Sequence, residues 1–146
     1  MLRAIIDATA FATKPENRKQ IAEAIAPANY LNQPVTVVEQ VLTGTFADGL
    51  GNVRTVPDRI DFDPFPWRSF AVWIMTQMKR WGQLKADVDY AAVAEQVFLA
   101  TDTARLMREV GLTPPASTSK SVVVMGKTFD PAAPDEYVKS FAIRRV

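Results

Sequence analysis

The side chains most often used as catalytic bases, thiol nucleophiles and zinc ligands are missing, because the 146 residues include no histidine and no cysteine. Ser-His-Asp triads, Cys-His pairs and disulfides are excluded for the same reason. No serine or threonine lies in a pattern that supplies a general base. We therefore predict that the protein is not an enzyme, that it has no catalytic residues, and that it uses no cofactor.

Asp58, Asp61 and Asp63 are the residues whose carboxylates come closest to a cation-binding pattern. They lack the glycine and the bidentate glutamate of a calcium-binding loop. Aspartate next to proline is typical of turns, because its side chain bonds to the nearby backbone. We interpret the three aspartates as turn and cap residues and predict no metal site.

Two short segments and one arginine could contact an anion. Gly49 and Gly51 lie in a loop, but no Gly-x-x-x-x-Gly-Lys-Ser/Thr or Gly-x-Gly-x-x-Gly pattern accompanies them, so turn glycines are favoured. Ser117-Thr118-Ser119 could donate hydroxyl groups, although a solvated linker is the favoured interpretation. Arg68 is the one arginine that we nominate, with a surface arginine or an intramolecular salt bridge as the favoured alternative. No ligand-binding residue is assigned.

Composition and charge place the chain in an ordinary globular class. Hydrophobic residues make up 48% and charged residues 23%, and 17 basic against 16 acidic residues give a net charge of +1. Without a basic block, we do not expect nucleic acid as a partner. No apolar run reaches the roughly 20 residues that span a bilayer, and no signal peptide is present, so we expect no direct membrane insertion. The length predicts a single domain over residues 1–146.

Residues 66–82 contain all three tryptophans and follow one helical period, with Pro66 suited to the start and Gly82 to the end. At about 100° per residue, one apolar stripe forms, which we expect to be buried, with Trp73 on its flank. The stripe comprises Trp67, Phe70, Ala71, Ile74, Met78 and Trp81. The face expected to be solvated comprises Arg68, Ser69, Val72, Thr76, Lys79 and Arg80.

Most other segments also have helical patterns, which predicts a mainly α fold with a minor β content. A Thr13-x-x-Glu16 capping box precedes a helix that ends near Pro27. Residues 34–44 favour a helix, with a strand as the alternative because of their β-branched content. Further helices are expected over 2–12, 91–99 and 104–110 and from 134 onward, with a strand or extended strip over 122–124. Residues 44–66 form a long connecting loop and 112–121 a linker.

Several segments, taken in order, match a known family. The chain resembles the C-terminal portion of the nitrate- and bicarbonate-binding proteins of ABC transporters, together with their cytoplasmic nitrate-sensor relatives. The matching pieces are Leu2-Arg3-Ala4-Ile5-Ile6-Asp7-Ala8, Pro15-Glu16-Asn17-Arg18, Asn29-Tyr30-Leu31-Asn32-Gln33-Pro34, Pro66-Trp67-Arg68-Ser69, Trp73-Ile74-Met75-Thr76-Gln77-Met78-Lys79-Arg80-Trp81-Gly82, Ser117-Thr118-Ser119, Gly126-Lys127-Thr128-Phe129-Asp130-Pro131 and Tyr137-Val138-Lys139-Ser140-Phe141.

The resemblance implies a two-lobed, type II periplasmic-binding-protein-like fold that closes on a small anion, of which this chain is the helical C-terminal part. The family's anion-contacting residues precede this region, so none is transferred to this chain. The implied function is part of a substrate-binding component for nitrate or a similar anion, working with an ABC permease. The alternatives are a cytoplasmic nitrate-sensing regulatory fragment that binds a partner protein, and a standalone helical interaction module.

The resemblance also has consequences for location and for the surface. It implies a periplasmic protein if an export signal precedes the chain, and a cytoplasmic one otherwise. Trp73 and part of the apolar stripe would then meet a lobe that this chain does not contain. We therefore expect an exposed apolar patch or self-association.

Overall fold

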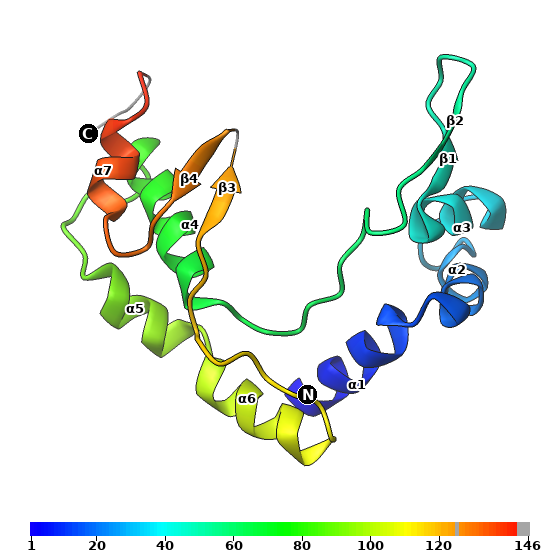
Figure 1. Ribbon diagram of the computed structural model, residues 1–146, viewed down its shortest axis with the longest axis horizontal. Coiled ribbons are helices and arrows are strands. Elements are labelled where there is room, and N and C mark those ends of the chain that lie inside the picture. The colour runs from blue at the N-terminus through cyan, green and yellow to red at the C-terminus, as the bar shows by residue number, and fades with distance from the viewer. Residues whose placement is uncertain (125, 143–146) are drawn as a thin grey trace. The chain divides into compact units, whose positions relative to one another are not determined.

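The computed structural model describes residues 1–124 and 126–142 (Figure 1). Helices dominate these residues, which confirms the predicted mainly α class. The elements are α1 (Leu2–Thr13), η1 (Pro15–Asn17), α2 (Arg18–Ile25), α3 (Val35–Thr43), β1 (Thr45–Ala47), β2 (Val53–Thr55), α4 (Arg68–Arg80), α5 (Tyr90–Val97), α6 (Ala100–Glu109), β3 (Val122–Val124), β4 (Lys127–Phe129) and α7 (Pro134–Lys139).

The chain forms two compact units, Met1–Pro64 and Phe65–Val146, called here the first and second units. Each has a hydrophobic cluster built from its own residues. Whether the two units together make the single domain expected over 1–146 stays a prediction.

In the first unit, α2 packs against α3. Ala22 of α2 and Ala26, which directly follows α2, pack against Val38 and Leu42 of α3. All four side chains are buried. Alanines leave room for the larger side chains of the facing helix. Pro34 and Gly44 bound α3 as expected, so the helix is confirmed and the strand alternative for this segment is wrong.

The capping box predicted at Thr13 is wrong. Thr13 is the last residue of α1, and its hydroxyl donates to the carbonyl of Thr9 at 2.9 Å. A short 3-10 turn, η1, follows, and α2 begins only at Arg18, without a side-chain cap. The threonine bonds back into its own helix, which removes the hydroxyl from the capping role.

The loop expected over 44–66 is partly regular. Strands β1 and β2 pair antiparallel in the register Thr45↔Thr55 and Ala47↔Val53. The Asp48 carboxylate closes the connection by accepting the Leu50 N–H at 2.8 Å and the Asn52 N–H at 3.2 Å. These bonds, led by the one from Leu50, lower the pKa of Asp48. Strands of three residues are too short for side-chain alternation to reveal them.

In the second unit, α4, α5 and α7 and the β3–β4 hairpin surround one core. Its buried members are Ala71, Val72, Met75, Ala94, Phe129 and Tyr137. Phe129 is completely buried, and its ring contacts that of Tyr137 edge-on, with centroids 5.0 Å apart. Strand β3 confirms the strand expected over 122–124, while its partner β4 was not anticipated.

Helix α4 forms where the tryptophan segment predicts it, but the predicted buried face is only partly confirmed, by the burial of Ala71. Ile74 and Trp81, expected to be buried, are 44% and 55% exposed. Ser69, Val72 and Thr76, expected to be solvated, are buried. Small polar side chains can be buried here because they find partners: the Ser69 hydroxyl accepts the Lys120 N–H at 3.1 Å, and the Thr76 hydroxyl donates to the Trp73 carbonyl at 2.6 Å.

Asp89 caps α5. Its carboxylate accepts the N–H of Ala92 at 3.0 Å. We expect Asp89→Ala to lower the free energy of unfolding by about 1 kcal/mol, because one N-terminal N–H loses its acceptor. Chemical denaturation measures the change. Asp89→Asn is the control, since its amide oxygen still accepts the bond, and an equal loss in both variants would contradict a capping role.

Candidate functional site

Arg18 is the charged residue around which the first unit builds a pocket. It is the first residue of α2, and its side chain is buried, with 9% of the residue exposed. One terminal nitrogen, Nη1, donates to the carbonyls of Leu42 at 2.7 Å and Pro57 at 3.2 Å. The buried Nε has no hydrogen-bond partner among the described residues. The guanidinium is therefore held at one nitrogen and unsatisfied at another.

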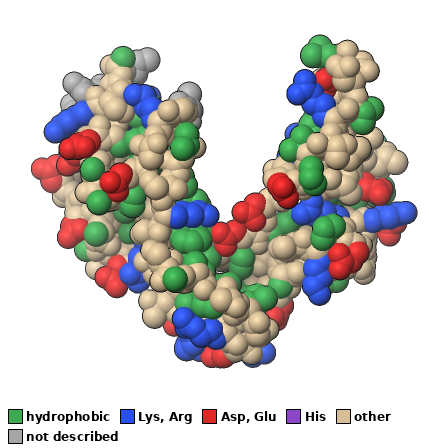
Figure 2. Space-filling model, viewed as in Figure 1, with side chains coloured by type: hydrophobic (Ala, Val, Ile, Leu, Met, Phe, Trp, Pro, Cys, Tyr) green, Lys and Arg blue, Asp and Glu red, His purple; other side chains and the backbone are tan. Residues whose placement is uncertain are grey.

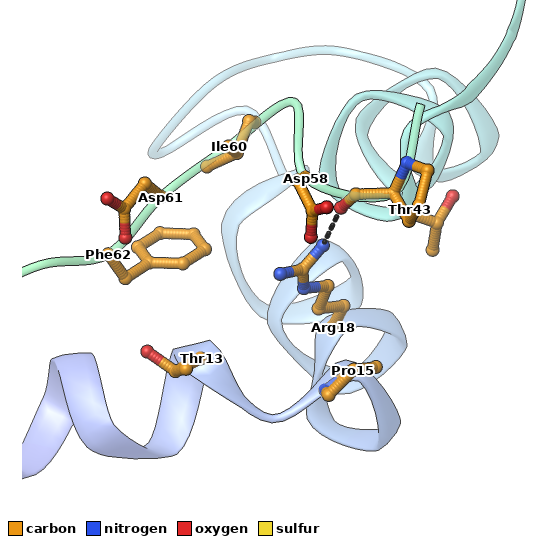
Figure 3. A pocket seen from close by; sticks show the side chains of 9 residues that line it. Thr13, Pro15, Arg18, Thr43, Asp58, Ile60, Asp61 and Phe62 are labelled. Carbon is orange, nitrogen blue, oxygen red and sulfur yellow. Dashed lines mark hydrogen bonds between the residues drawn. The ribbon is translucent and has the colours of Figure 1, made fainter. Parts of the chain in front are cut away.

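The pocket beside Arg18 has a volume of about 420 Å³ and is made by first-unit residues alone (Figure 3). Its lining combines polar, acidic and apolar groups: Thr13, Pro15, Arg18, Thr43, Pro57, Asp58, Ile60, Asp61 and Phe62. Among the described residues, no carboxylate oxygen lies within 4.0 Å of the Arg18 guanidinium, although Asp58 and Asp61 line the same pocket. The Arg18 guanidinium thus has no direct ion pair among the described residues, although two acidic side chains line the same pocket.

We did not predict Arg18 as a site residue from the sequence. It lies in the Pro15-Glu16-Asn17-Arg18 segment that supports the family resemblance, which was the only available signal. Its burial depends on carbonyls 24 and 39 residues further along the chain. Asp58 and Asp61 were interpreted as turn residues, and the structure brings both to the pocket wall.

Arg68, the arginine that the sequence nominates, forms an intramolecular salt bridge. Its Nη2 lies 3.3 Å from the Glu95 carboxylate and donates to the Thr101 hydroxyl at 3.3 Å. This confirms the alternative that was favoured for it. Ser117-Thr118-Ser119 is likewise used within the fold, because the Ser117 hydroxyl donates to the Ser119 carbonyl and the Thr118 carbonyl accepts the Arg68 N–H.

An apolar groove on the second unit is lined by side chains of α4 and β3. It has a volume of about 360 Å³ and is formed by Phe70, Trp73, Ile74, Val122 and Val124. Trp73 is half-buried, and its Nε1–H donates to the Tyr137 hydroxyl at 3.2 Å. Figure 2 shows further apolar side chains, in green, at the molecular surface. Of the groove residues, Ile74 of the predicted stripe is exposed and the other four are half-buried, so the larger exposed patch stays a prediction.

Within residues 1–124 and 126–142, no group of three or more acidic side chains is arranged to hold a metal ion. In the same residues, every helix is too short or too polar to cross a bilayer.

Comparison with known proteins identifies relatives along the whole chain. No family model matches it. The nitrate/nitrite binding protein NrtA of Nostoc sp. is 26% identical over 156 aligned residues, which cover 100% of this chain and 36% of the relative. The bicarbonate transport ATP-binding protein CmpC of Synechocystis sp. is 25% identical over 99% of this chain and 22% of its own length. The chain thus spans about a third or less of the length of these curated relatives.

The fold comparison agrees with the sequence comparison. The crystal structure of the periplasmic nitrate-binding protein NrtA from Synechocystis matches 95% of this chain and 39% of its own chain, with a TM-score of 0.87 and 21% identity. In sequence along its whole length and in fold, the chain resembles the nitrate- and bicarbonate-binding proteins of ABC transporters, and its length fits a C-terminal portion of them.

Proposed function

We propose that this chain is part of the substrate-binding component for nitrate or a similar small anion in an ABC-type uptake system, and that it acts without catalysis. The main support for this proposal is the whole-chain alignment with NrtA proteins, together with the fold match. Within this proposal the chain supplies the helical C-terminal part of a two-lobed fold and works beside an ABC permease in the periplasm. No observation favours the regulatory alternative, because the relatives are named as binding and transport proteins.

The apolar groove supports this placement. Apolar side chains that line an open groove and are only partly covered by their own chain are typical of a surface that packs against other protein. Most of the matched NrtA chain lies outside the part that corresponds to this chain. We propose that the remainder of the two-lobed fold covers the groove formed by Phe70, Trp73, Ile74, Val122 and Val124. Self-association of the free chain through the same groove follows when that remainder is missing.

The nitrate-type anion is expected to bind only in the complete fold. A small oxyanion is held by converging N–H groups and a cation between walls that exclude water. The nominated Arg68 is engaged by Glu95 and Thr101 within this chain. We therefore expect no micromolar nitrate binding to the chain alone.

A chimera tests the proposal. The segment of Nostoc NrtA that aligns with this chain is replaced by residues 1–146, and nitrate binding is measured by calorimetry. We expect the chimera to bind nitrate with a dissociation constant within about tenfold of intact NrtA, a difference of about 1.4 kcal/mol. NrtA truncated before the segment should not bind. A chimera that fails to fold by circular dichroism, or folds without binding, contradicts the proposal.

Ile74→Glu tests whether the remaining fold covers the groove, in the free chain and in the same chimera. The side chain is 44% exposed in this chain, so the free chain should lose less than about 0.5 kcal/mol of unfolding free energy. In the chimera the new carboxylate would be buried against the remaining fold, and the melting temperature should fall. An equal effect in both backgrounds would show that nothing covers the groove.

A further inference from the structure

We propose that the Arg18 pocket binds a small zwitterion that carries one carboxylate and one ammonium group, such as a short α-amino acid. The pocket consists entirely of first-unit residues. The pocket is therefore complete in this chain, whereas the nitrate-type site on which the proposed function rests is expected only in the complete two-lobed fold. Failure of the zwitterion proposal and failure of the proposed function can therefore be observed independently.

The buried guanidinium supplies the first requirement. Arg18 is about nine-tenths buried, and among the described residues no carboxylate lies within 4.0 Å of it. Buried charges in proteins are normally paired, because desolvation without a partner is unfavourable. An anionic group in the adjoining pocket would supply the missing counter-ion. Planar oxyanions such as carboxylates match the fork of guanidinium donors better than spherical anions do.

The orientation of Arg18 leaves donors for such a group. Its Nη1 is held by the carbonyls of Leu42 and Pro57, which fixes the plane of the guanidinium. In Figure 3 the opposite edge of the guanidinium faces the side of the pocket where Thr13 and Phe62 lie. A guanidinium anchored at one nitrogen loses little further side-chain entropy when a ligand binds at the others.

The acidic lining argues against a simple inorganic anion. Asp58 and Asp61 both line the pocket, and no hydrogen bond to either carboxylate is formed within the described residues. A bare anion would add a third negative charge to the two aspartates, with only Arg18 as a positive charge in the pocket, which is unfavourable. A ligand with an ammonium group beside its carboxylate offers donors to the aspartates while it pairs with Arg18. The charge pattern of the pocket therefore selects a zwitterion.

The size and the apolar wall restrict the rest of the ligand. A volume of about 420 Å³ lies within the range of small-molecule sites. Pro15, Ile60 and Phe62 form an apolar part of the lining, which suits a short aliphatic side chain. L-alanine has the required two charges and a methyl group, and we choose it as the probe.

The test is an amide NMR titration of the isotope-labelled whole chain with L-alanine, acetate, methylammonium and nitrate. We expect saturable shifts with L-alanine at Thr13, Arg18 and residues 58–62. Acetate, methylammonium and nitrate should each bind at least about tenfold more weakly, because each satisfies only one side of the charge pattern. Absence of saturable shifts with L-alanine, or equal affinity for acetate or nitrate, overturns the proposal.

Variants assign the two sides of the pocket. Arg18→Gln should abolish L-alanine binding. Because loss of a buried arginine can also unfold the unit, the decisive variant is the double substitution Asp58→Asn with Asp61→Asn, at two exposed positions. It should weaken L-alanine binding about tenfold and leave acetate binding unchanged or stronger. Asp7→Asn, at an exposed aspartate of α1 outside the pocket, should change neither. Equal L-alanine binding by the double variant and by Asp7→Asn would refute the zwitterion assignment.

Discussion

Phe129→Ala is expected to lower the free energy of unfolding by roughly 4 kcal/mol, because a fully buried ring is replaced by a methyl group and a cavity. Phe129 is completely buried in the core of the second unit. Its loss also removes the edge-on contact with Tyr137, whose ring centroid is 5.0 Å away. For a chain of this size the melting temperature should fall by roughly 10 °C.

Two controls distinguish the core position from phenylalanine loss in general. Phe129→Leu retains most of the buried volume and should lose about 1 kcal/mol. Phe11 is 44% exposed on α1, and Phe11→Ala should lose less than about 1 kcal/mol. Calorimetric melting with circular dichroism as a fold check measures all three. A loss in Phe129→Ala no larger than that in Phe11→Ala would contradict the assignment of this core.

Gly44→Ala should destabilise the first unit by roughly 3 kcal/mol, because strain and a steric clash act together. Gly44 ends α3 with a φ of +74°, and its N–H donates to the carbonyl of Gln40. A Cβ atom at this position would lie 2.0 Å from the carbonyl oxygen of Val56. Val56 also donates its N–H to the Gly44 carbonyl at 2.8 Å, so the two segments cannot separate without breaking that bond.

Gly49→Ala is the matched control for Gly44→Ala. Gly49 also has a positive φ, +76°, but nothing lies within 4 Å of the position that a Cβ would take. It should lose only the strain energy of about 1 kcal/mol. The difference between the two variants isolates the clash with Val56. Equal losses in chemical denaturation would show that the close backbone approach contributes nothing.

Several helix ends were predictable from the sequence because their signals are local, although α6 begins at Ala100, four residues before the expected start. Pro34 and Gly44 bound α3, Asp89 caps α5, and Pro134 opens α7. Proline and glycine act through their own backbone torsions, and a cap reaches only a few residues. The short strands β1, β2 and β4 have no comparable signal, since each depends on its partner for hydrogen bonds.

The candidate site was not predictable in the same way. The Arg18 pocket joins α2 to residues 57–62, and its key hydrogen bonds run to Leu42 and Pro57. No local pattern reports that an arginine at the start of a helix will be buried by carbonyls that lie far along the chain. The arginine that was nominated, Arg68, has its acidic partner on another helix, which the sequence also does not reveal.

Helix α4 shows which properties follow from local sequence patterns and which follow from packing. Composition excluded histidine and cysteine chemistry, and periodicity established a helix with an apolar stripe. Which side of α4 the second unit buries was decided by the tertiary structure: Ser69, Val72 and Thr76 face its core, and Ile74 stays exposed. The periodicity indicates that the apolar stripe is in contact with protein. It does not indicate which segment, of this chain or of another, provides that contact. Only the packing of elements distant in the chain, such as β3, β4 and α7, selects the buried face.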